Sequence, residues 1–387
     1  MKKTLYEYCT GCGLCQAYGI ATLQEDQKGF LHPIEGDEKK LEKICPSGGN
    51  QCRQMDATKI WGKTKGVYYG WSEDKNVRKQ ASSGGVITEI AAYLLESNYV
   101  DAIIHTCMNP DSPTETVTCI STTRTELIER CGSRYAISHP LLNFSNLDRN
   151  LRYAFIGKPC DVTALKNYMD IDAELKKMIP VTISFFCAGL PSVHAQKRLL
   201  ERLGCEEDAS SLRYRGNGWP GYATVITKDG RESSIDYNSS WGEILGRDVM
   251  KMCRFCLDGV GEMADISCGD AWYLTQEGKP DFSEHEGRNV IFVRSSAGED
   301  VLNRMTALAK IHLEAFPDYE EKLKYMQFYQ NDRRATMWAK VLALKLMGRV
   351  TPRYGVNVLS SYSKHTSIKR NASIFKGTIK RILEKKI

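Results

Sequence analysis

The sequence predicts an α/β protein, in which an α+β body with a mixed sheet follows a small cysteine-rich module. From Gly66 onward, strand-like segments alternate with segments whose apolar residues recur at helical spacing, which favours a largely parallel or mixed sheet. Residues 1 to about 65 instead contain five cysteines, a turn-rich middle and no long periodic segment. The 387 residues exceed what one hydrophobic core usually supports, so two or three folded units are expected.

The body is expected to begin with the strand-like GVYYGW, followed by a helix whose apolar residues lie three or four apart between Val86 and Leu95. Further strands are expected at 100–106, 153–157, 181–186 and 290–294, β-rich sequence at 222–237, and helices at 161–169, at 193–203 and through Leu308. We therefore divide the chain into a module (1–65), two parts of the body (66–150 and 151–330) and a basic helical tail (331–387).

The composition resembles that of a soluble globular protein, with 42% hydrophobic and 26% charged residues, and this excludes wholesale disorder. No run of eighteen apolar residues predicts a transmembrane helix, and the first residues lack the apolar region of a secretory signal. We therefore expect a cytoplasmic protein. Fourteen cysteines are too few for a disulfide scaffold and many for a cytosolic enzyme, which indicates metal or redox chemistry.

The net charge of +6 comes from the tail. Residues 341–387 contain eleven Lys and Arg against one acid, so they carry +10 and residues 1–340 carry −4. Apolar residues between Phe375 and Leu383 recur at helical spacing among these bases. This helix is either solvated with one packed face or lies on an anionic membrane surface, which would make the protein peripheral at the inner face of a membrane. We expect no nucleic-acid partner.

The first cysteine motif, CTGCGLC, places three thiols at two-residue gaps, and a fourth cysteine stands directly before a proline in ICPSGG. Its members are Cys9, Cys12, Cys15 and Cys45. This is the ferredoxin pattern, in which thiolates hold a 4Fe–4S cluster, and it makes residues 1–65 a ferredoxin-like iron–sulfur module.

Glycines in this motif, Gly11 and Gly13, let the loop turn so that backbone N–H groups point at the sulfurs. Zinc is the structural alternative, although zinc sites usually pair two C-x-x-C motifs rather than use a triplet. Cys52 is a substitute candidate for the fourth ligand.

Four further cysteines have distinctive contexts. One lies at a strand-to-helix turn in FIGKPCDV, one follows the apolar strand of ISFFCAG, and two form the MCRFC motif; they are Cys160, Cys187, Cys253 and Cys256. Strand ends in α/β sheets are where ligand sites collect, so these cysteines are candidates to converge on a second cluster. The alternative reading of MCRFC is a thioredoxin-like dithiol, but it lacks a clear preceding strand.

Several ordered motifs resemble the coenzyme F-420 hydrogenase/dehydrogenase beta-subunit family, which includes a plant-type hydroxymethyl-chlorophyll reductase and bacterial members found among polysaccharide genes. The motifs are SSGGVITEIAAYLL, CGSRYAIS, GKPCDVTALKNY, FCAGLPS, RYRGNGWPGY and CRFCLDGVGEMADISCGDAW. The resemblance covers roughly residues 66–320, and the N-terminal ferredoxin-like motif is a common companion. It implies FAD in addition to iron–sulfur, and a second 4Fe–4S cluster held by Cys160, Cys187, Cys253 and Cys256.

The remaining cysteines lack ligand-like spacing. We expect Cys107, Cys119, Cys131 and Cys205 to be small buried hydrophobic residues and Cys268 to have a packing role.

The segment Ser82, Ser83, Gly84 and Gly85 stands just before a strongly amphipathic helix. Serines at the cap satisfy free N–H groups and glycines let an anion approach the backbone, so a pyrophosphate is the natural ligand. The resemblance implies that this ligand is the pyrophosphate of FAD. The alternative is that the segment is an ordinary helix cap without a ligand. A GxGxxG fingerprint is absent, which weakens any case for direct NAD binding.

Other candidate contacts to the flavin or substrate are scattered along the body. Ser133 and Tyr135 follow an acidic helical segment, Gly157 and Lys158 lie beside Cys160, and Asp270 follows ISCG. Each has an ordinary structural alternative as a loop, turn or helix-cap residue. Asn217, Gly218 and Trp219 are candidates for a substrate face, and His139 is a weak candidate proton donor.

Clusters move one electron at a time, whereas a flavin accepts two and passes a hydride. The sequence therefore predicts an iron–sulfur flavoprotein oxidoreductase that couples a ferredoxin-like carrier to a two-electron substrate, either sugar-related or a deazaflavin. The alternatives are an electron-transfer subunit of a larger hydrogenase, dehydrogenase or polysaccharide-biosynthesis complex, and a zinc-stabilised binding protein.

Overall fold

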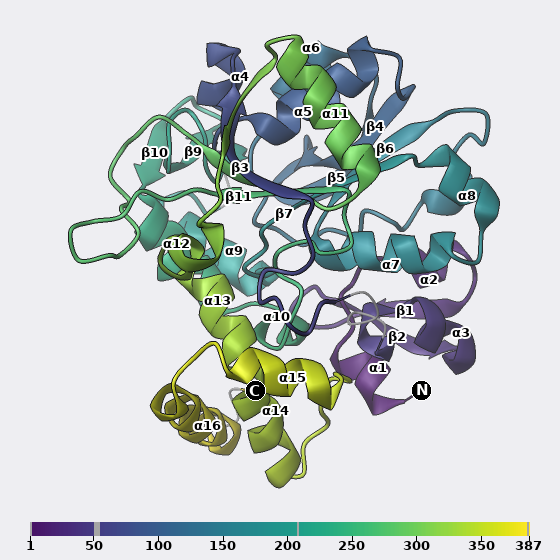
Figure 1. The fold of residues 1–387 in the computed structure, drawn as a ribbon, viewed down its shortest axis with the longest axis vertical. Coiled ribbons are helices and arrows are strands. Elements are labelled where there is room, and N and C mark those ends of the chain that lie inside the picture. Colours follow the sequence, from purple (N-terminus) through teal and green to yellow (C-terminus); the bar gives the residue numbers. More distant parts are fainter. Residues whose placement is uncertain (1, 50–54, 207–208, 385–386) are drawn as a thin grey trace.

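The computed structural model describes residues 2–49, 55–206, 209–384 and 387 (Figure 1). In these residues the largest sheet has eight strands in the order β13-β3-β12-β11-β7-β6-β4-β5. In chain order they are β3 (Gly66–Ser72), β4 (Ala102–Asn109), β5 (Ser112–Ser121), β6 (Tyr153–Gly157), β7 (Val181–Phe185), β11 (Ile266–Asp270), β12 (Asn289–Val293) and β13 (Ile311–Ala315). The strands β4, β6, β7 and β11 are parallel, and the outer pairs are antiparallel. The predicted α/β body with a mixed sheet is confirmed.

Helices cover both faces of this sheet. On one face, α5 (Val86–Glu96), α6 (Arg124–Glu129) and α11 (Ser296–Ala307) bury their apolar residues against the central strands. On the other face lie α7 (Pro159–Met169), α8 (Ala173–Met178), α12 (Tyr319–Met326) and α13 (Phe328–Ala335). Because the central strands are buried on both faces, β6 is a nearly continuous apolar run, as expected for a parallel strand, whereas β7 also buries Thr182 and Ser184.

A smaller antiparallel sheet lies beside the body. It contains β8 (Ala209–Arg213), β9 (Ala223–Thr227) and β10 (Glu232–Ile235), and α9 (Val193–Arg202) packs on it. The remaining short elements of the body are α4 (Lys75–Gln80), α10 (Lys251–Arg254), η3 (Phe144–Asn146), η4 (Asn238–Gly242) and η5 (Leu245–Arg247).

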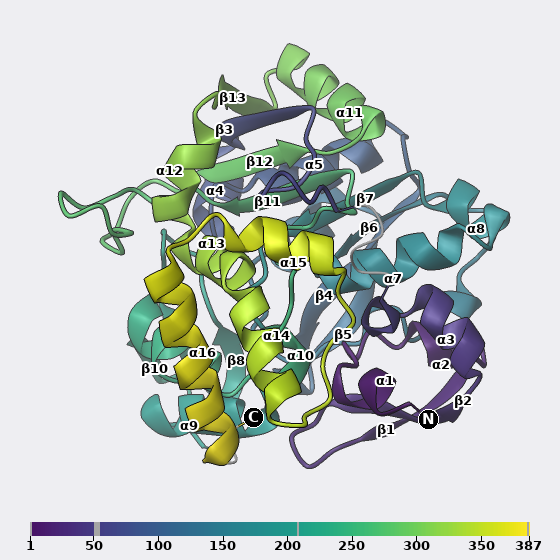
Figure 2. The same cartoon turned by 60° about the horizontal axis from the view of Figure 1, so that its bottom comes forward.

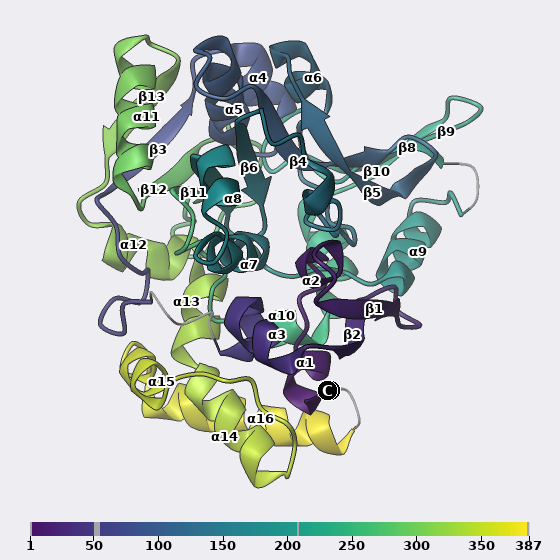
Figure 3. The same ribbon diagram turned by 90° about the vertical axis from the view of Figure 1, so that its right-hand side faces the viewer.

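The N-terminal elements pack directly against the body. They are α1 (Lys3–Glu7), α2 (Leu14–Ala17), β1 (Ala21–Glu25), β2 (Leu31–Gly36), α3 (Glu38–Ile44) and η1 (Pro46–Gly48). Leu5, Leu14 and Leu41 share one core with residues of α7 and with strands β4 and β6. Figure 3 shows this segment lying against α7. The predicted division into four segments, and the ferredoxin-like character of the first, stay predictions.

The C-terminal segment forms α14 (Met337–Leu346), α15 (Val356–Ser363) and α16 (Ile368–Leu383), which lie together at one end of the molecule (Figure 2). Thr378 and Ile382 of α16 are buried, whereas Ile368 and Leu383 are exposed. This matches the alternative of a helix with one packed face. Among the described residues, no helix is long and apolar enough to cross a membrane.

Candidate functional site

The four cysteines of the first motif converge. Cys15 lies in α2, and Cys45 ends α3 directly before Pro46, so a helix end brings the distant cysteine back to the N-terminal loop. Burial, followed by the thiols of Cys45, Cys12 and Cys15, raises the pKa of Cys9. Burial also raises the pKa of Cys12, and it raises that of Cys15 to about 12. Thiols that ionise with such difficulty become thiolates where a bound cation compensates their charge.

The loop that carries these thiols has the predicted glycine geometry. Gly11 and Gly13 have φ values of +66° and +90°, in the left-handed region. A Cβ on Gly13 would lie 2.9 Å from the backbone of Leu142, so the loop also needs glycine for close packing. The Gly11 N–H group donates to Cys9 Sγ at 3.3 Å, as the motif predicted. Cys52 lies outside the described residues.

The second set of cysteines also converges, at the carboxyl edge of the parallel strands. Cys160 lies in the first turn of α7, which Pro159 begins directly after β6, and Cys187 follows β7. Cys253 lies in α10, and Cys256 follows that helix. Burial raises the pKa of Cys160 and Cys253, and the thiols of Cys187 and Cys256 raise both further.

Hydrogen bonds also reach these sulfurs. The Leu190 N–H group donates to Cys253 Sγ at 3.3 Å, and Cys256 Sγ donates to the Asp258 carbonyl at 3.3 Å. In the described residues, no three His, Cys, Asp or Glu side chains lie close enough to hold a single metal ion. A cluster of several irons needs a wider ring, because each thiolate binds a different iron. Two groups of four buried or partly buried thiols fit such clusters in donor chemistry.

The other cysteines behave differently. Cys205 and Cys268 are buried in apolar cores, which agrees with a packing role. Cys131 is half-buried. Cys107 is buried, as predicted, but the structure joins it to the half-buried Cys119 in a disulfide across the β4–β5 pair, so the prediction of two small buried hydrophobic residues missed their pairing. Sequence spacing did not indicate this pair, since the β4–β5 pairing was not predicted.

A cavity of about 690 Å³ adjoins the second thiol group and shares Cys187 with it. Eight of the nine predicted flavin contacts line this cavity: Ser82, Ser83, Gly85, Ser133, Tyr135, Gly157, Lys158 and Asp270. Gly84 does not line it. A Cβ on Gly84 would lie 2.8 Å from the Gly70 carbonyl and from the Asn289 side chain, so Gly84 is needed for packing against β3 and β12.

The serine loop before α5 differs from the predicted cap. Gly85, at φ +77°, is the N-cap, and no side chain caps α5 within the described structure. Ser82 Oγ instead accepts from the Ser133 N–H group at 2.5 Å, and Ser83 Oγ donates to the Arg288 carbonyl at 3.0 Å. The serines therefore tie the loop to neighbouring segments, and the capping prediction is wrong because these competing partners lie far away in sequence.

Lys158 and Asp270, the two charged candidates, are both held by partners. Lys158 Nζ lies 2.8 Å from the buried Asp161 carboxylate and donates to Ser138 Oγ at 2.7 Å, so much of its charge is compensated locally. Asp270 accepts two bonds from Arg215, at 2.9 and 3.0 Å, and one from Trp219 Nε1 at 2.8 Å. Asp270 therefore orients Arg215. The sequence analysis did not predict Arg215 as a site residue.

Arg215 lies with its guanidinium over the rings of Tyr237 and Trp272, at 4.9 and 5.3 Å from their centroids. All three side chains line the cavity, as do Phe328 and Tyr329 of α13. Tyr237, Phe328 and Tyr329 belong to none of the motifs, whereas Arg215 and Trp272 lie in RYRGNGWPGY and CGDAW. The arginine in RYRGNGW was the sequence feature that could have indicated this site. That motif was interpreted only as part of the family resemblance.

A buried histidine, His105, also lines the cavity and was not predicted. Its Nε2 atom lies 2.8 Å from Ser121 Oγ. Burial lowers its pKa to about 4, so the ring is neutral near neutral pH. By contrast, His139 does not line the cavity; its Nδ1 atom lies 2.5 Å from the Gly11 carbonyl, beside the first thiol group.

Of the candidate substrate face, Trp219 is buried and stacks on Trp272, with ring centroids 4.7 Å apart. Asn217, Gly218 and Trp219 are not among the cavity-lining residues of the described structure. These residues form a turn with a packed tryptophan.

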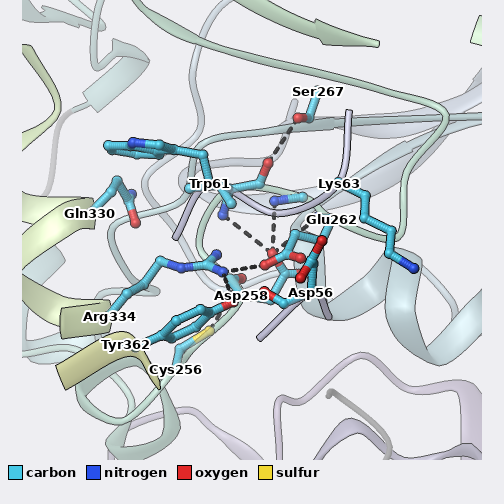
Figure 4. A network of polar contacts seen from close by, with 12 residues as sticks. Asp56, Trp61, Lys63, Cys256, Asp258, Glu262, Ser267, Gln330, Arg334 and Tyr362 are labelled. Carbon is cyan, nitrogen blue, oxygen red and sulfur yellow. Dashed lines mark hydrogen bonds and ion pairs between the residues drawn. The ribbon is translucent and has the colours of Figure 1, made fainter. Parts of the chain in front are cut away.

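A buried polar network lies around the segment that follows Cys256 (Figure 4). Arg334 forms an ion pair with Glu262 and donates to Tyr362 Oη at 2.7 Å. Asp258 Oδ1 accepts from the Gly261 and Glu262 N–H groups at 2.9 and 3.1 Å. The network therefore fixes the loop after Cys256 between α13 and α15.

The described fold and cavity define an α/β protein with two thiol groups beside a ligand-sized cavity. The sequence profile described as coenzyme F420 hydrogenase/dehydrogenase, beta subunit N-term, matches residues 67–144, and its C-terminus counterpart matches residues 150–319. The chain belongs to the coenzyme F420 hydrogenase/dehydrogenase beta-subunit family. The predicted family is confirmed.

Named relatives are oxidoreductases or their subunits. The chain is 22% identical to coenzyme F420 hydrogenase subunit beta of Methanococcus voltae, over 76% of this chain and 99% of that protein. It is 23% identical to the coenzyme F420-dependent sulfite reductase of Methanocaldococcus jannaschii, over 82% and 48%. It is 24% identical to the chloroplastic 7-hydroxymethyl chlorophyll a reductase of Oryza sativa subsp. japonica, over 78% and 62%.

The fold also matches a solved structure. A chain of the F420-reducing [NiFe] hydrogenase complex from Methanosarcina barkeri, studied by xenon derivatization, superposes with a TM-score of 0.52 at 20% identity. The match covers 73% of this chain and 95% of that chain. The likeness supports the described fold.

Proposed function

We propose that this chain is an oxidoreductase that binds two 4Fe–4S clusters and FAD and passes electrons between a ferredoxin-like carrier and a two-electron substrate. The observation that carries the proposal is the position of Cys187, which belongs both to the second thiol group and to the cavity wall. Iron–sulfur clusters supply one-electron transfer and a flavin supplies two-electron transfer, so adjacent sites suit an exchange between the two.

The proposed ligands of the first cluster are Cys9, Cys12, Cys15 and Cys45, and those of the second are Cys160, Cys187, Cys253 and Cys256. Two contacts support transfer between the groups. Tyr8, next to Cys9, packs edge-on against Phe255, next to Cys256, with ring centroids 5.8 Å apart. Burial, followed by the buried Asp161 carboxylate, raises the pKa of Cys160. The same carboxylate also raises the pKa of Cys12, so it lies near a thiol of each group.

The cavity is the proposed FAD site. Its volume lies within the roughly 300–1,000 Å³ of typical ligand pockets, and Arg215 and Lys158 supply cationic groups in its wall. Ser82, Ser83 and Gly85 form the backbone loop that an anionic pyrophosphate would approach at the start of α5. Ser133, Tyr135, Gly157 and Asp270 contribute polar groups and close backbone on the remaining walls. The substrate is proposed to be sugar-related or a deazaflavin.

The decisive experiment is anaerobic purification followed by measurement of iron, acid-labile sulfide and released flavin. The proposal expects eight irons and one flavin per chain, and reduction by a ferredoxin-like donor. Colourless anaerobic protein without sulfide or flavin would refute it. A screen that offers nucleotide sugars and a deazaflavin as acceptors then separates the two substrate classes.

A second candidate function is an electron-transfer subunit without its own substrate. It is favoured because the relative from Methanococcus voltae is named a subunit and the matching solved chain belongs to a hydrogenase complex. Co-purification with a catalytic subunit, together with a lack of turnover by the isolated loaded chain, would support this function over the first.

A further inference from the structure

Arg333 of α13 is a buried cation that has no acidic partner among the residues that the structure describes. It is 3% exposed. Its guanidinium donates to the Cys187 carbonyl at 3.0 Å, to the Cys253 carbonyl at 3.5 Å and to Gln330 Oε1 at 2.6 Å. In the described part of the chain these acceptors are all uncharged, and Arg333 Nε is buried without a partner. The next residue, Arg334, has Glu262 as its counterion.

A glycine in the loop after Cys256 leaves space for the Arg333 guanidinium. A Cβ on Gly259 would lie only 1.5 Å from Arg333 Nη2, so a larger residue at this position of the loop after Cys256 would displace the guanidinium. The Gly259 carbonyl also accepts from the Cys187 N–H group at 2.9 Å. Gln330 Nε2 donates to the Cys187 carbonyl at 3.0 Å. Two residues of α13 therefore bind the backbone of proposed cluster ligands.

Burying a guanidinium without a negative charge nearby is strongly unfavourable, and arginine does not lose its proton to avoid this cost. The guanidinium binds the backbone carbonyls of Cys187 and Cys253, two of the four residues of the second thiol group. The nearby source of negative charge is therefore the second thiol group. Four thiolates carry more negative charge than a 4Fe–4S core carries positive charge, so the assembled cluster is an anion.

We propose that Arg333 is the counterion of the second cluster and raises its reduction potential relative to the first. The inference rests on the proposed function. Reduction adds an electron to an already negative cluster, and a buried cation stabilises the reduced form more than the oxidised form. The residue that does this lies beyond residue 319, where the family match ends. Electrons that enter at the first cluster are thereby drawn towards the cavity.

The test compares Arg333→Met and Arg333→Lys in the anaerobic holoprotein. Redox titration followed by electron paramagnetic resonance measures the midpoint potential of each cluster, and a Cys256→Ser variant assigns the signals. Arg333→Met should shift the reduction equilibrium of the second cluster at least tenfold towards the oxidised form, about 59 mV for one electron. The first cluster should not shift. Arg333→Lys, which keeps the charge, should restore most of the potential.

The matched control is Arg370→Met. It removes a surface guanidinium of α16 that lies 2.7 Å from Asp332, the residue before Arg333 in α13. It should shift neither potential. An unchanged second potential in Arg333→Met, or an equal shift in both clusters, would overturn the inference. If Arg333→Met loses the second cluster, retention of that cluster by Arg333→Lys supports the charge and its loss in both variants contradicts it. Failure of the proposed function itself is distinct, because the unmodified protein would then lack clusters.

Discussion

Removing one partner of the Arg334–Glu262 ion pair should destabilise the protein far more than removing a surface pair. Arg334 is fully buried, the Glu262 side chain is 3% exposed, and Arg334 also donates to Tyr362 Oη at 2.7 Å. Arg334→Met leaves the buried Glu262 carboxylate without its ion-pair partner, with Arg294 as a remaining nearby cation. Breaking a buried pair in this way costs about 3–5 kcal/mol. We expect that loss in the free energy of unfolding, measured by urea titration.

The matched control is again Arg370→Met, since the Arg370–Asp332 pair joins α16 to α13 at the surface and is worth about 0.2–1 kcal/mol. A double variant with Glu262→Gln should lose about 2–3 kcal/mol less than the sum of the two single variants, because removing both charges leaves neither uncompensated. Additive losses, or a loss in Arg334→Met no larger than in Arg370→Met, would refute the reasoning.

Further predictions concern the thiols, the cavity and the tail. Cys256→Ser should lower the iron content by half while the flavin remains; loss of all iron would contradict two independent sites. Asp270→Asn should lower flavin retention in dialysis at least tenfold, because Arg215 loses its charged partner, and unchanged retention would argue against this role. Burial depresses the folded-state pKa of His105 to about 4 from 6.5, so the stability it contributes is present above pH 6.5 and is lost as pH falls towards 4. His105→Gln should therefore flatten the acid limb of urea stability measured from pH 7 to 4, by up to about 3 kcal/mol; an unchanged limb would contradict burial as the cause. Flotation with anionic liposomes should fall for Lys369→Glu/Lys376→Glu if the tail binds a membrane, and equal recovery would dismiss that hypothesis.

The sequence was sufficient for the elements with strong apolar character. The predicted strand at 153–157 is β6, the one at 181–186 is β7 with one residue fewer, and the helix at 193–203 is α9. The strands β5 and β11 were not predicted. β5 has Glu115 and Val117 between its threonines rather than a run of apolar residues, and β11 contains Cys268 and Gly269, so neither has strong apolar character. Their positions depend on pairing with β4 and β7.

The positions of the thiols were predictable where residues nearby in the sequence determine them. The two-residue gaps of the first motif place three thiols on one loop, and Pro46 marks the fourth. The convergence of Cys160 and Cys187 follows from the rule that parallel strands end at one edge. The serine loop was predicted in place but not in role, since Arg288 and the Ser133 backbone compete for the hydroxyl groups.

The charges around the site were not predictable, because compensation of a buried charge is a property of the folded state. The run NDRRATM has the composition of a solvated helix surface, yet it places two adjacent buried arginines in different environments. Arg334 forms an ion pair with a carboxylate from the loop after Cys256, whereas Arg333 binds the carbonyls of Cys187 and Cys253. A sequence pattern counts both as surface bases. The different roles depend on the conformation of the loop after Cys256. Asp258 holds this loop by hydrogen bonds, and Gly259 leaves space for the Arg333 guanidinium. As a result, Arg334 stabilises the fold, whereas Arg333 lies beside the proposed cluster.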